Sequence, residues 1–271
     1  MIYVITHKEF DDAFLNSEHY QVLHVGKNDS CKKKWVRDDT GDQISDKNPS
    51  YCELTGLYWI WKNGKEKADD ITGLLHYRRF FTTEEENRNY IRKGIRPELL
   101  SWNVIQNDIS NGYVILPKET KTLDTVYRTY GRVHYAGDLD EVGKIIHERC
   151  PDYDEAFKEV MNSHAISYAN MMICTKEILD AYCSWLFPIL SEAEKAIRQS
   201  HAENQNETVY QSRVIGFLGE RLLNVWMKKN ALKIRRYPVF NTEKPDLTPV
   251  QMAEFRMRAL LKLVEGKKEK Q

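Results

Sequence analysis

The sequence has no apolar run approaching the roughly 18 residues that a membrane-spanning helix needs. Its start, Met-Ile-Tyr-Val-Ile-Thr-His-Lys, lacks the basic region and the cleavage site of a secretion signal. Net charge is absent too, because 40 lysines and arginines balance 40 aspartates and glutamates. No overall field would then attract nucleic acid or an anionic surface, so any anion site must be local. We predict a cytoplasmic protein with no nucleic-acid partner.

Cysteine is also scarce. The five cysteines are scattered and form no C-x-x-C pair: Cys31, Cys52, Cys150, Cys174 and Cys183. Neither a zinc site nor a redox dithiol is therefore predicted, and the thiols are expected to be buried.

The 271 residues are enough for one large α/β domain with a helical C-terminal part. Short apolar runs predict strands at 2–5, 22–26, 71–75 and 113–116, and a polar helical segment between the first two gives the β-α-β order of an α/β sheet. A polar stretch at 28–48 predicts a long loop. Helical spacing of apolar residues predicts helices at 51–63, 139–149, 154–161, 176–199, 211–230 and 249–265.

The helix at 51–63 carries a capping pattern at its start. Ser50 suits the N-cap, and Glu53 stands three residues later, as in a capping box. We therefore interpret Glu53 as a capping carboxylate rather than as a catalyst.

A cationic motif, His76-Tyr77-Arg78-Arg79-Phe80-Phe81, follows the apolar run at 71–75. Arginine offers a rigid fork of donors that matches phosphate or carboxylate. Ligands of open α/β sheets bind beyond the carboxyl ends of the strands, where this motif is expected to lie. The alternative is a strand end whose arginines pair with acidic side chains. The period of two along a strand places His76 and Arg78 on one face and Arg79 on the other, so only one arginine should enter the site unless the strand has already ended.

Several longer motifs resemble a known family. They are Ile-Thr-His-Lys at the start, Ile-Ser-Asp-Lys-Asn at 44–48, the helix at 51–63, Gly-Leu-Leu-His-Tyr-Arg-Arg-Phe-Phe at 73–81, Val-Ile-Leu-Pro-Lys at 114–118, Ser-Tyr-Ala-Asn at 167–170, Tyr-Cys-Ser-Trp-Leu-Phe at 182–187 and Gly-Glu-Arg-Leu-Leu at 219–223. Together they resemble the bacterial capsular-polysaccharide-synthesis glycosyltransferases, a family long catalogued as a domain of unknown function. The resemblance covers residues 1–240 and leaves 241–271 as a basic amphipathic C-terminal helix and tail.

The resemblance implies a GT-A-like nucleotide-sugar-binding fold, with a mostly parallel sheet and helices on both faces. It further implies a hexosyltransferase, expected to be inverting, that uses a UDP-sugar and extends capsule, O-antigen or exopolysaccharide. Family members with an assigned reaction resemble galactofuranosyltransferases, so galactofuranose is the specific expectation.

Such enzymes usually hold a divalent metal with an Asp-x-Asp pair after a central strand, where this chain has the cationic motif instead. We predict that Arg78 and Arg79, helped by a catalytic His76, do part or all of the metal's electrostatic work. Further donor or phosphate contacts are expected beyond the first strand and at the start of the helix at 51–63. These residues are Thr6, His7, Lys8, Ser45 and Asn48.

Asp-x-Asp sequences occur elsewhere, at Asp138-Leu139-Asp140 and at 152–154. Asp138 and Asp140 are the candidates for Mn²⁺ or Mg²⁺, although capping of the next helix also explains them, and metal-independent transfer stays open. Asp138 is also the preferred general base, because it follows an aromatic stretch at 127–135 that is expected to shape an acceptor pocket. The other candidate bases are Asp38, Asp39, Asp42, Asp140, Glu203 and Glu220.

Two residues, His134 and Asn170, are predicted to contact the glycan or lipid-linked acceptor. The basic amphipathic segment at 249–265 suits peripheral docking at the cytoplasmic leaflet, or packing on the domain. Two rival functions remain: a non-catalytic phosphate- or nucleotide-binding module, and a nucleotide-sugar hydrolase or phosphotransferase.

Overall fold

The computed structural model describes residues 1–16, 18–27, 32, 34–93, 96–201 and 211–243. The helix predicted at 249–265 therefore lies outside the described residues. Of the helices within them, none is both long and apolar enough to cross a bilayer.

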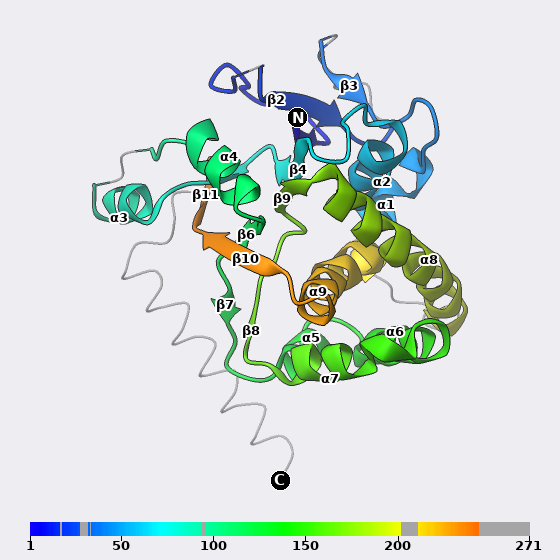
Figure 1. Cartoon of the computed structure of the whole chain (residues 1–271). Coiled ribbons are helices and arrows are strands. Elements are labelled where there is room, and N and C mark those ends of the chain that lie inside the picture. Colours follow the sequence, from blue (N-terminus) through cyan, green and yellow to red (C-terminus); the bar gives the residue numbers. More distant parts are fainter. Residues whose placement is uncertain (17, 28–31, 33, 94–95, 202–210, 244–271) are drawn as a thin grey trace.

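A nine-stranded sheet forms the centre of the molecule (Figure 1). Its main path runs in the order β10 (Lys233–Tyr237), β6 (Tyr113–Pro117), β9 (Met172–Thr175), β4 (Ile71–His76), β1 (Ile2–Thr6), β2 (Tyr20–His24) and β3 (Val36–Arg37). All of these strands run in one direction except β9, which is antiparallel to both of its neighbours. The expected α/β fold with a mostly parallel sheet is confirmed.

Two short strands branch from this path. β5 (Arg79–Phe81) pairs with the end of β4 and with β11 (Val239–Asn241). A separate two-stranded sheet joins β7 (Thr120–Lys121) to β8 (Ala165–Ile166).

Both faces of the sheet are buried, as expected for parallel strands. Along β1, Tyr3 and Ile5 belong to one core cluster, and Ile2 and Val4 belong to the other. The first cluster contains residues of α2 (Leu54–Asn63), α8 (Lys176–His201) and α9 (Val214–Lys229), whereas α4 (Trp102–Ser110) covers the second. Helices therefore lie on both faces of the sheet.

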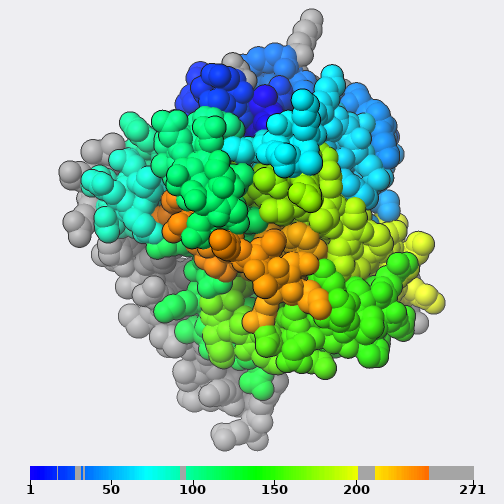
Figure 2. Space-filling view, viewed as in Figure 1, coloured from blue at the N-terminus to red at the C-terminus, as the bar shows by residue number. Residues whose placement is uncertain are grey.

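Three helices extend the first face into a helical part: α5 (Val126–Gly131), α6 (Ala136–Arg149) and α7 (Asp154–Asn162). They pack around α8 and α9 below the sheet in Figure 1. In the space-filling view, the last described residues, in orange, fill the surface between this part and α4 (Figure 2). The chain from β1 to β11 thus forms one continuous body.

Gly73 allows β4 and β9 to approach each other closely. A Cβ at this position would lie 2.4 Å from the carbonyl oxygen of Met172 and 2.8 Å from the Cα of Ile173. Any larger residue would push β9 away from the centre of the sheet.

The polar helix predicted between the first two strands is wrong. Of the described residues from 7 to 19, none is helical. Asp12 in this segment accepts hydrogen bonds from the Lys32 and Trp35 side chains, while Phe10 and Phe14 pack on the second core cluster. These tertiary contacts outweigh the local helical tendency. The sequence pattern also did not predict α3 (Glu84–Lys93), α4, α5, β10 or β11.

The helix predicted at 51–63 is two helices, α1 (Asn48–Tyr51) and α2. Cys52 interrupts them with a positive φ of 53°. Ser50 lies inside α1, and Glu53 stands before α2 without capping it. The interpretation of Glu53 as a capping carboxylate is therefore wrong, because its side chain turns toward Asn170 instead.

Candidate active site

A cleft of about 910 Å³ opens at the carboxyl ends of β1, β2 and β4. In an open α/β sheet this is the edge at which ligands bind. The junction of α1 and α2, the end of α5 and the start of α9 complete its walls. The polar and aromatic residues that line it are Thr6, His7, Lys8, Asn48, Cys52, Glu53, His76, Tyr77, Arg78, Arg79, Thr129, His134, Tyr168, Ser212, Arg213, Phe217, Glu220 and Arg221.

The cationic motif forms a tight hairpin at the mouth of β4. The strand ends at His76, the chain reverses through Tyr77 and Arg78, and β5 begins at Arg79, opposite His76. Directly opposed residues of an antiparallel pair share a face. His76 and Arg79 thus enter the cleft together, and Arg78 lines it from the turn. The strand has therefore ended before Arg78, which is the exception stated above, and both arginines line the cleft.

His76 is half-buried and neutral. Its Nε2 lies 2.5 Å from the carbonyl oxygen of Ala169, which can only accept, so Nε2 must carry the hydrogen. Burial, together with the positive charge of Arg79, lowers the pKa of His76 to about 3. At neutral pH this imidazole adds no charge to the site and instead holds the peptide at Ala169.

Arg79 is the guanidinium that is open to a ligand. Burial and the neighbouring Arg78 lower its pKa. No other residue of the described chain forms an ion pair or a hydrogen bond with its side chain. The Arg78 guanidinium, by contrast, pairs with the carboxylate of Glu243 at 3.3 Å.

The residues after β1 extend this cationic wall. Lys8 Nζ lies 2.9 Å from the other carboxylate oxygen of Glu243, so one carboxylate bridges Lys8 and Arg78. Thr6 is buried, and its hydroxyl donates to the Lys8 carbonyl at 2.5 Å. Burial, followed by the charge of Lys8, lowers the pKa of His7, which packs edge-on against Tyr77.

Ser45 and Asn48 differ in their access to the cleft. Asn48 lines it and donates to the Cys52 carbonyl at 2.9 Å. Ser45 is buried away from the lining, and its hydroxyl donates to Asp38 at 2.6 Å. Asp38 also accepts from the backbone N–H of Gly26 at 3.0 Å, so this candidate base anchors the loop instead.

Two half-buried carboxylates, Glu53 and Glu220, line the cleft. Glu53 accepts a hydrogen bond from Asn170 Nδ2 at 2.7 Å. Glu220 accepts from the backbone N–H of Ala169 at 2.9 Å and forms an ion pair with Arg221 at 2.8 Å. Burial raises the pKa of both carboxyl groups, and the positive charge of Arg79 opposes that rise.

Strained backbone conformations occur next to these two carboxylates. Three residues other than glycine have positive φ angles here, Cys52 at 53°, Ala169 at 81° and Asn170 at 48°. Such residues persist only where their surroundings hold them, and they are frequent at functional sites. Asn170 is itself buried and does not line the cleft, so it reaches the site through Glu53.

The stretch at 127–135 lies beside the cleft, with Thr129, Val133 and His134 in the lining. The His134 ring packs on Phe217 with 4.1 Å between centroids, and its Nδ1 lies 3.2 Å from Gln211 Oε1. Burial lowers the pKa of His134. The lining residues of this stretch add no charge at neutral pH, although Arg213 and Arg221 lie against the neighbouring rings of Phe217 and Tyr130.

Asp138 and Asp140 do not meet in the cleft. α6 begins at Ala136, so Asp138 lies within its first turn and is not the N-cap. Asp138 is buried and accepts from the Tyr130 hydroxyl at 3.4 Å, whereas Asp140 accepts from Tyr127 at 3.0 Å. Residues two apart on a helix point in different directions. The pair does not fit a metal ion, and no group of three histidines, cysteines or carboxylates within the described residues does so either.

The sequence interpretation missed Arg213, Phe217 and the cleft-facing position of Arg221. These residues stand at intervals of four on α9 and the turn before it, so they share one face of the helix. Arg221 is buried between the rings of Tyr130 and Tyr168, at 5.0 and 5.1 Å from their centroids. The spacing of arginine and phenylalanine was the available signal.

Comparison with known proteins assigns the chain to a family. Residues 1–231 match the family model described as "Domain of unknown function (DUF4422)". The chain belongs to this family, and the recognition made from its motifs is confirmed. No curated protein matches the chain.

A solved structure described as "WbbM bifunctional glycosytransferase apo structure" is similar to this member of the family, with 30% sequence identity and a TM-score of 0.72. The alignment covers 89% of this chain and 45% of that one, so the chain spans less than half the length of WbbM. The two share a fold over that region.

Proposed function

We propose that the chain is a glycosyltransferase that moves a hexose from a UDP-sugar onto a growing capsule, O-antigen or exopolysaccharide glycan. Arg79 carries the proposal, because it presents an unpaired guanidinium at the strand ends, where a GT-A-like fold receives its nucleotide. Transfer requires that the charge on the departing diphosphate be neutralised, and arginine binds such a group with two parallel hydrogen bonds.

The similarity to WbbM supports a transferase. That protein is described as a bifunctional glycosyltransferase, and this chain matches 45% of it. We infer that the matched region holds one transfer activity, with galactofuranose as the specific donor sugar.

The leaving group would bind along the cationic wall. Arg79 would contact the diphosphate first, and Arg78 and Lys8 would follow once Glu243 releases them. His76 would hold the Ala169 peptide in place without adding charge. Thr6, His7 and Asn48 line the side of the cleft that would receive the nucleoside.

Glu53 is the general base that the geometry favours over Asp138. Glu53 lines the cleft, whereas Asp138 does not, and Asn170 fixes one of its oxygens. A raised pKa suits a base that must take a proton from a sugar hydroxyl near neutral pH. With one base opposite the leaving group, the anomeric configuration would invert. His134 and the neighbouring aromatic rings would then contact the acceptor.

The function is tested by incubating the protein with a panel of UDP-sugars and measuring UDP release, with and without an acceptor glycan. We expect release that depends on the acceptor. Release without acceptor would indicate a hydrolase, and calorimetric UDP binding without any release would indicate a binding module. Parallel reactions with Mn²⁺, with Mg²⁺ and with EDTA test the metal requirement, and we expect activity in EDTA because Asp138 and Asp140 do not converge.

Peripheral contact with the inner membrane belongs to the same proposal. The sequence at 249–265 is basic and amphipathic, which suits docking near a lipid-linked acceptor. A chain that ends at Glu243 should bind anionic vesicles less than the full chain, and equal binding would argue against this role.

A further inference from the structure

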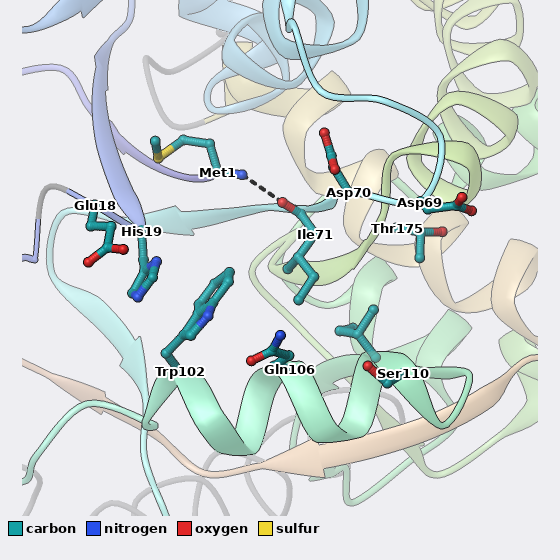
Figure 3. A pocket seen from close by; sticks show the side chains of 11 residues that line it. Met1, Glu18, His19, Asp69, Asp70, Ile71, Trp102, Gln106, Ser110 and Thr175 are labelled. Atoms are coloured by element: carbon teal, nitrogen blue, oxygen red, sulfur yellow. Dashed lines mark hydrogen bonds between the residues drawn. The ribbon is translucent and has the colours of Figure 1, made fainter.

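A second pocket, seen from close by in Figure 3, lies near the amino-terminal end of β4, whereas the cleft lies at the carboxyl end of that strand. Ile71, the first residue of β4, lines this pocket, whereas His76, the last, lines the cleft. The volume of about 590 Å³ lies within the usual range for small-ligand sites. We call it the distal pocket, and its lining comprises Met1, Glu18, His19, Asp69, Asp70, Ile71, Trp102, Gln106, Ile109, Ser110 and Thr175.

An aromatic plate forms one wall of the distal pocket. The His19 and Trp102 rings stack in parallel, with 4.0 Å between centroids and 7° between planes. Figure 3 shows Trp102 between His19 on one side and Gln106 on the other. His19 therefore supports one face of the indole, and the opposite face is turned to the pocket.

Hydrogen-bonding groups surround this plate. The side chains of Glu18, Asp69, Gln106 and Ser110 are exposed, and none of them forms a hydrogen bond or an ion pair with another described residue. Asp70 differs, since it accepts from the backbone N–H of Lys67 at 2.8 Å. The described lining contains three carboxylates, neither lysine nor arginine, and one ammonium, that of Met1, which donates to the Ile71 carbonyl at 2.6 Å and lies 3.7 Å from Glu66.

We propose that the distal pocket binds an uncharged oligosaccharide. A hexose ring has an apolar C–H face that packs on an aromatic ring, and its hydroxyls both donate and accept hydrogen bonds. Trp102 supplies the plate, and the carboxylates, amide and hydroxyl supply partners for the sugar hydroxyls. The three carboxylates outnumber the single ammonium of Met1, which the Ile71 carbonyl and Glu66 already hold. The net negative charge disfavours phosphate and uronate, so the site selects against the nucleotide sugars that the cationic cleft attracts. This binding does not depend on the proposed transfer activity.

Saturation-transfer NMR and calorimetry on the intact chain test the proposal without donor present. The probes are galactotriose, cellotriose and maltotriose as neutral trisaccharides, trigalacturonate as their acidic counterpart, and trilysine as a cationic peptide. At least one neutral trisaccharide should bind, and trigalacturonate should not. Trp102→Ala should weaken that binding by about tenfold or more, and Trp102→Phe should retain part of it because an aromatic face remains.

Arg79→Ala is the matched control, since it alters the cleft at the carboxyl end of β4 and should leave trisaccharide binding unchanged. The circular dichroism spectrum and the UDP binding of Trp102→Ala should match those of wild type. This result would show that the variant folds and lacks only the indole ring. Three results would overturn the proposal: no neutral trisaccharide binds, Trp102→Ala binds as well as wild type, or trilysine binds while the sugars do not.

Discussion

Asn170 Nδ2 lies 2.7 Å from Glu53 Oε1, although the two residues are 117 positions apart in the sequence. The same amide donates to the carbonyl of Gly216 at 3.1 Å. Asn170 stands just before the start of β9. Its side chain therefore connects the junction of α1 and α2 to α9. Asn170 adopts a positive φ of 48° to do so, which asparagine tolerates better than most residues. It holds the proposed base in position without facing the cleft itself.

Asn170→Gly should raise the pKa of Glu53 further. Glycine adopts the same φ without strain, so the change mainly removes the amide that stabilises the ionised carboxylate. A base acts in its ionised form, and the acid limb of the kcat profile should therefore move to higher pH. The profile of kcat against pH, measured with saturating donor, checks this prediction.

Ala169→Gly is the control for Asn170→Gly. Ala169 also has a positive φ, at 81°, but its side chain makes no hydrogen bond. The acid limb of the kcat profile of Ala169→Gly should therefore stay at the same pH as in wild type. An unshifted limb in Asn170→Gly would show that Glu53 is not the titrating base.

The strands were the most predictable part of the fold. β1, β4 and β6 are buried on both faces and hence appear as short, nearly continuous apolar runs. β10, with the sequence Lys-Ile-Arg-Arg-Tyr, is half exposed at the end of the sheet and carries no such run. Its pairing with β6 depends on contacts between segments far apart in the chain.

The candidate site was most predictable where it coincides with a strand end, although the predicted Asn48 and His134 also line the cleft. Arg78 and Arg79 could be predicted as ligand contacts because they follow the apolar run of β4, and ligands of such sheets bind beyond the carboxyl ends of the strands. Glu53 was missed because Ser50 and Glu53 have capping-box spacing, whereas the break at Cys52 arises in the folded chain and not from a local glycine or proline. No local pattern indicates that a helix start will contact Asn170.

Arg79→Ala should weaken UDP binding by about tenfold to about a hundredfold, which is the loss expected for hydrogen bonds to a charged group. Arg79→Lys should recover only part of the affinity, because lysine lacks the planar fork. Calorimetry with UDP measures both. Arg149→Ala, which removes an exposed arginine that pairs with Glu192, should bind UDP like wild type. Equal affinity of Arg79→Ala and Arg149→Ala would remove Arg79 from the donor site.

Glu243→Gln should tighten UDP binding by up to about fivefold, the limit set by exposed ion pairs. The Glu243 carboxylate bridges Lys8 and Arg78, at 2.9 and 3.3 Å, and a diphosphate must displace it. The gain should shrink as salt is added, because these charges are partly exposed. Glu192→Gln, which leaves Arg149 unpaired far from the cleft, serves as control. Weaker UDP binding by Glu243→Gln would mean that Glu243 supports the donor site and does not compete with the donor.

His76→Gln should make the protein less sensitive to acid. Burial, with the charge of Arg79, lowers the pKa of His76 from its model value of 6.5 to about 3 in the folded state. Between these two values the unfolded chain binds a proton that the folded chain does not, so the stability of wild type falls as pH drops, by up to about 1.4 kcal/mol per pH unit from this residue. Glutamine does not titrate and can still donate to the Ala169 carbonyl. Urea unfolding between about pH 7 and about pH 5 measures the free energy of unfolding of both proteins. The difference between them isolates His76, because the carboxylates and the other histidines are the same in both and contribute equally. Free energies of unfolding that fall in parallel would show that His76 takes up its proton at the same pH in the folded and the unfolded chain.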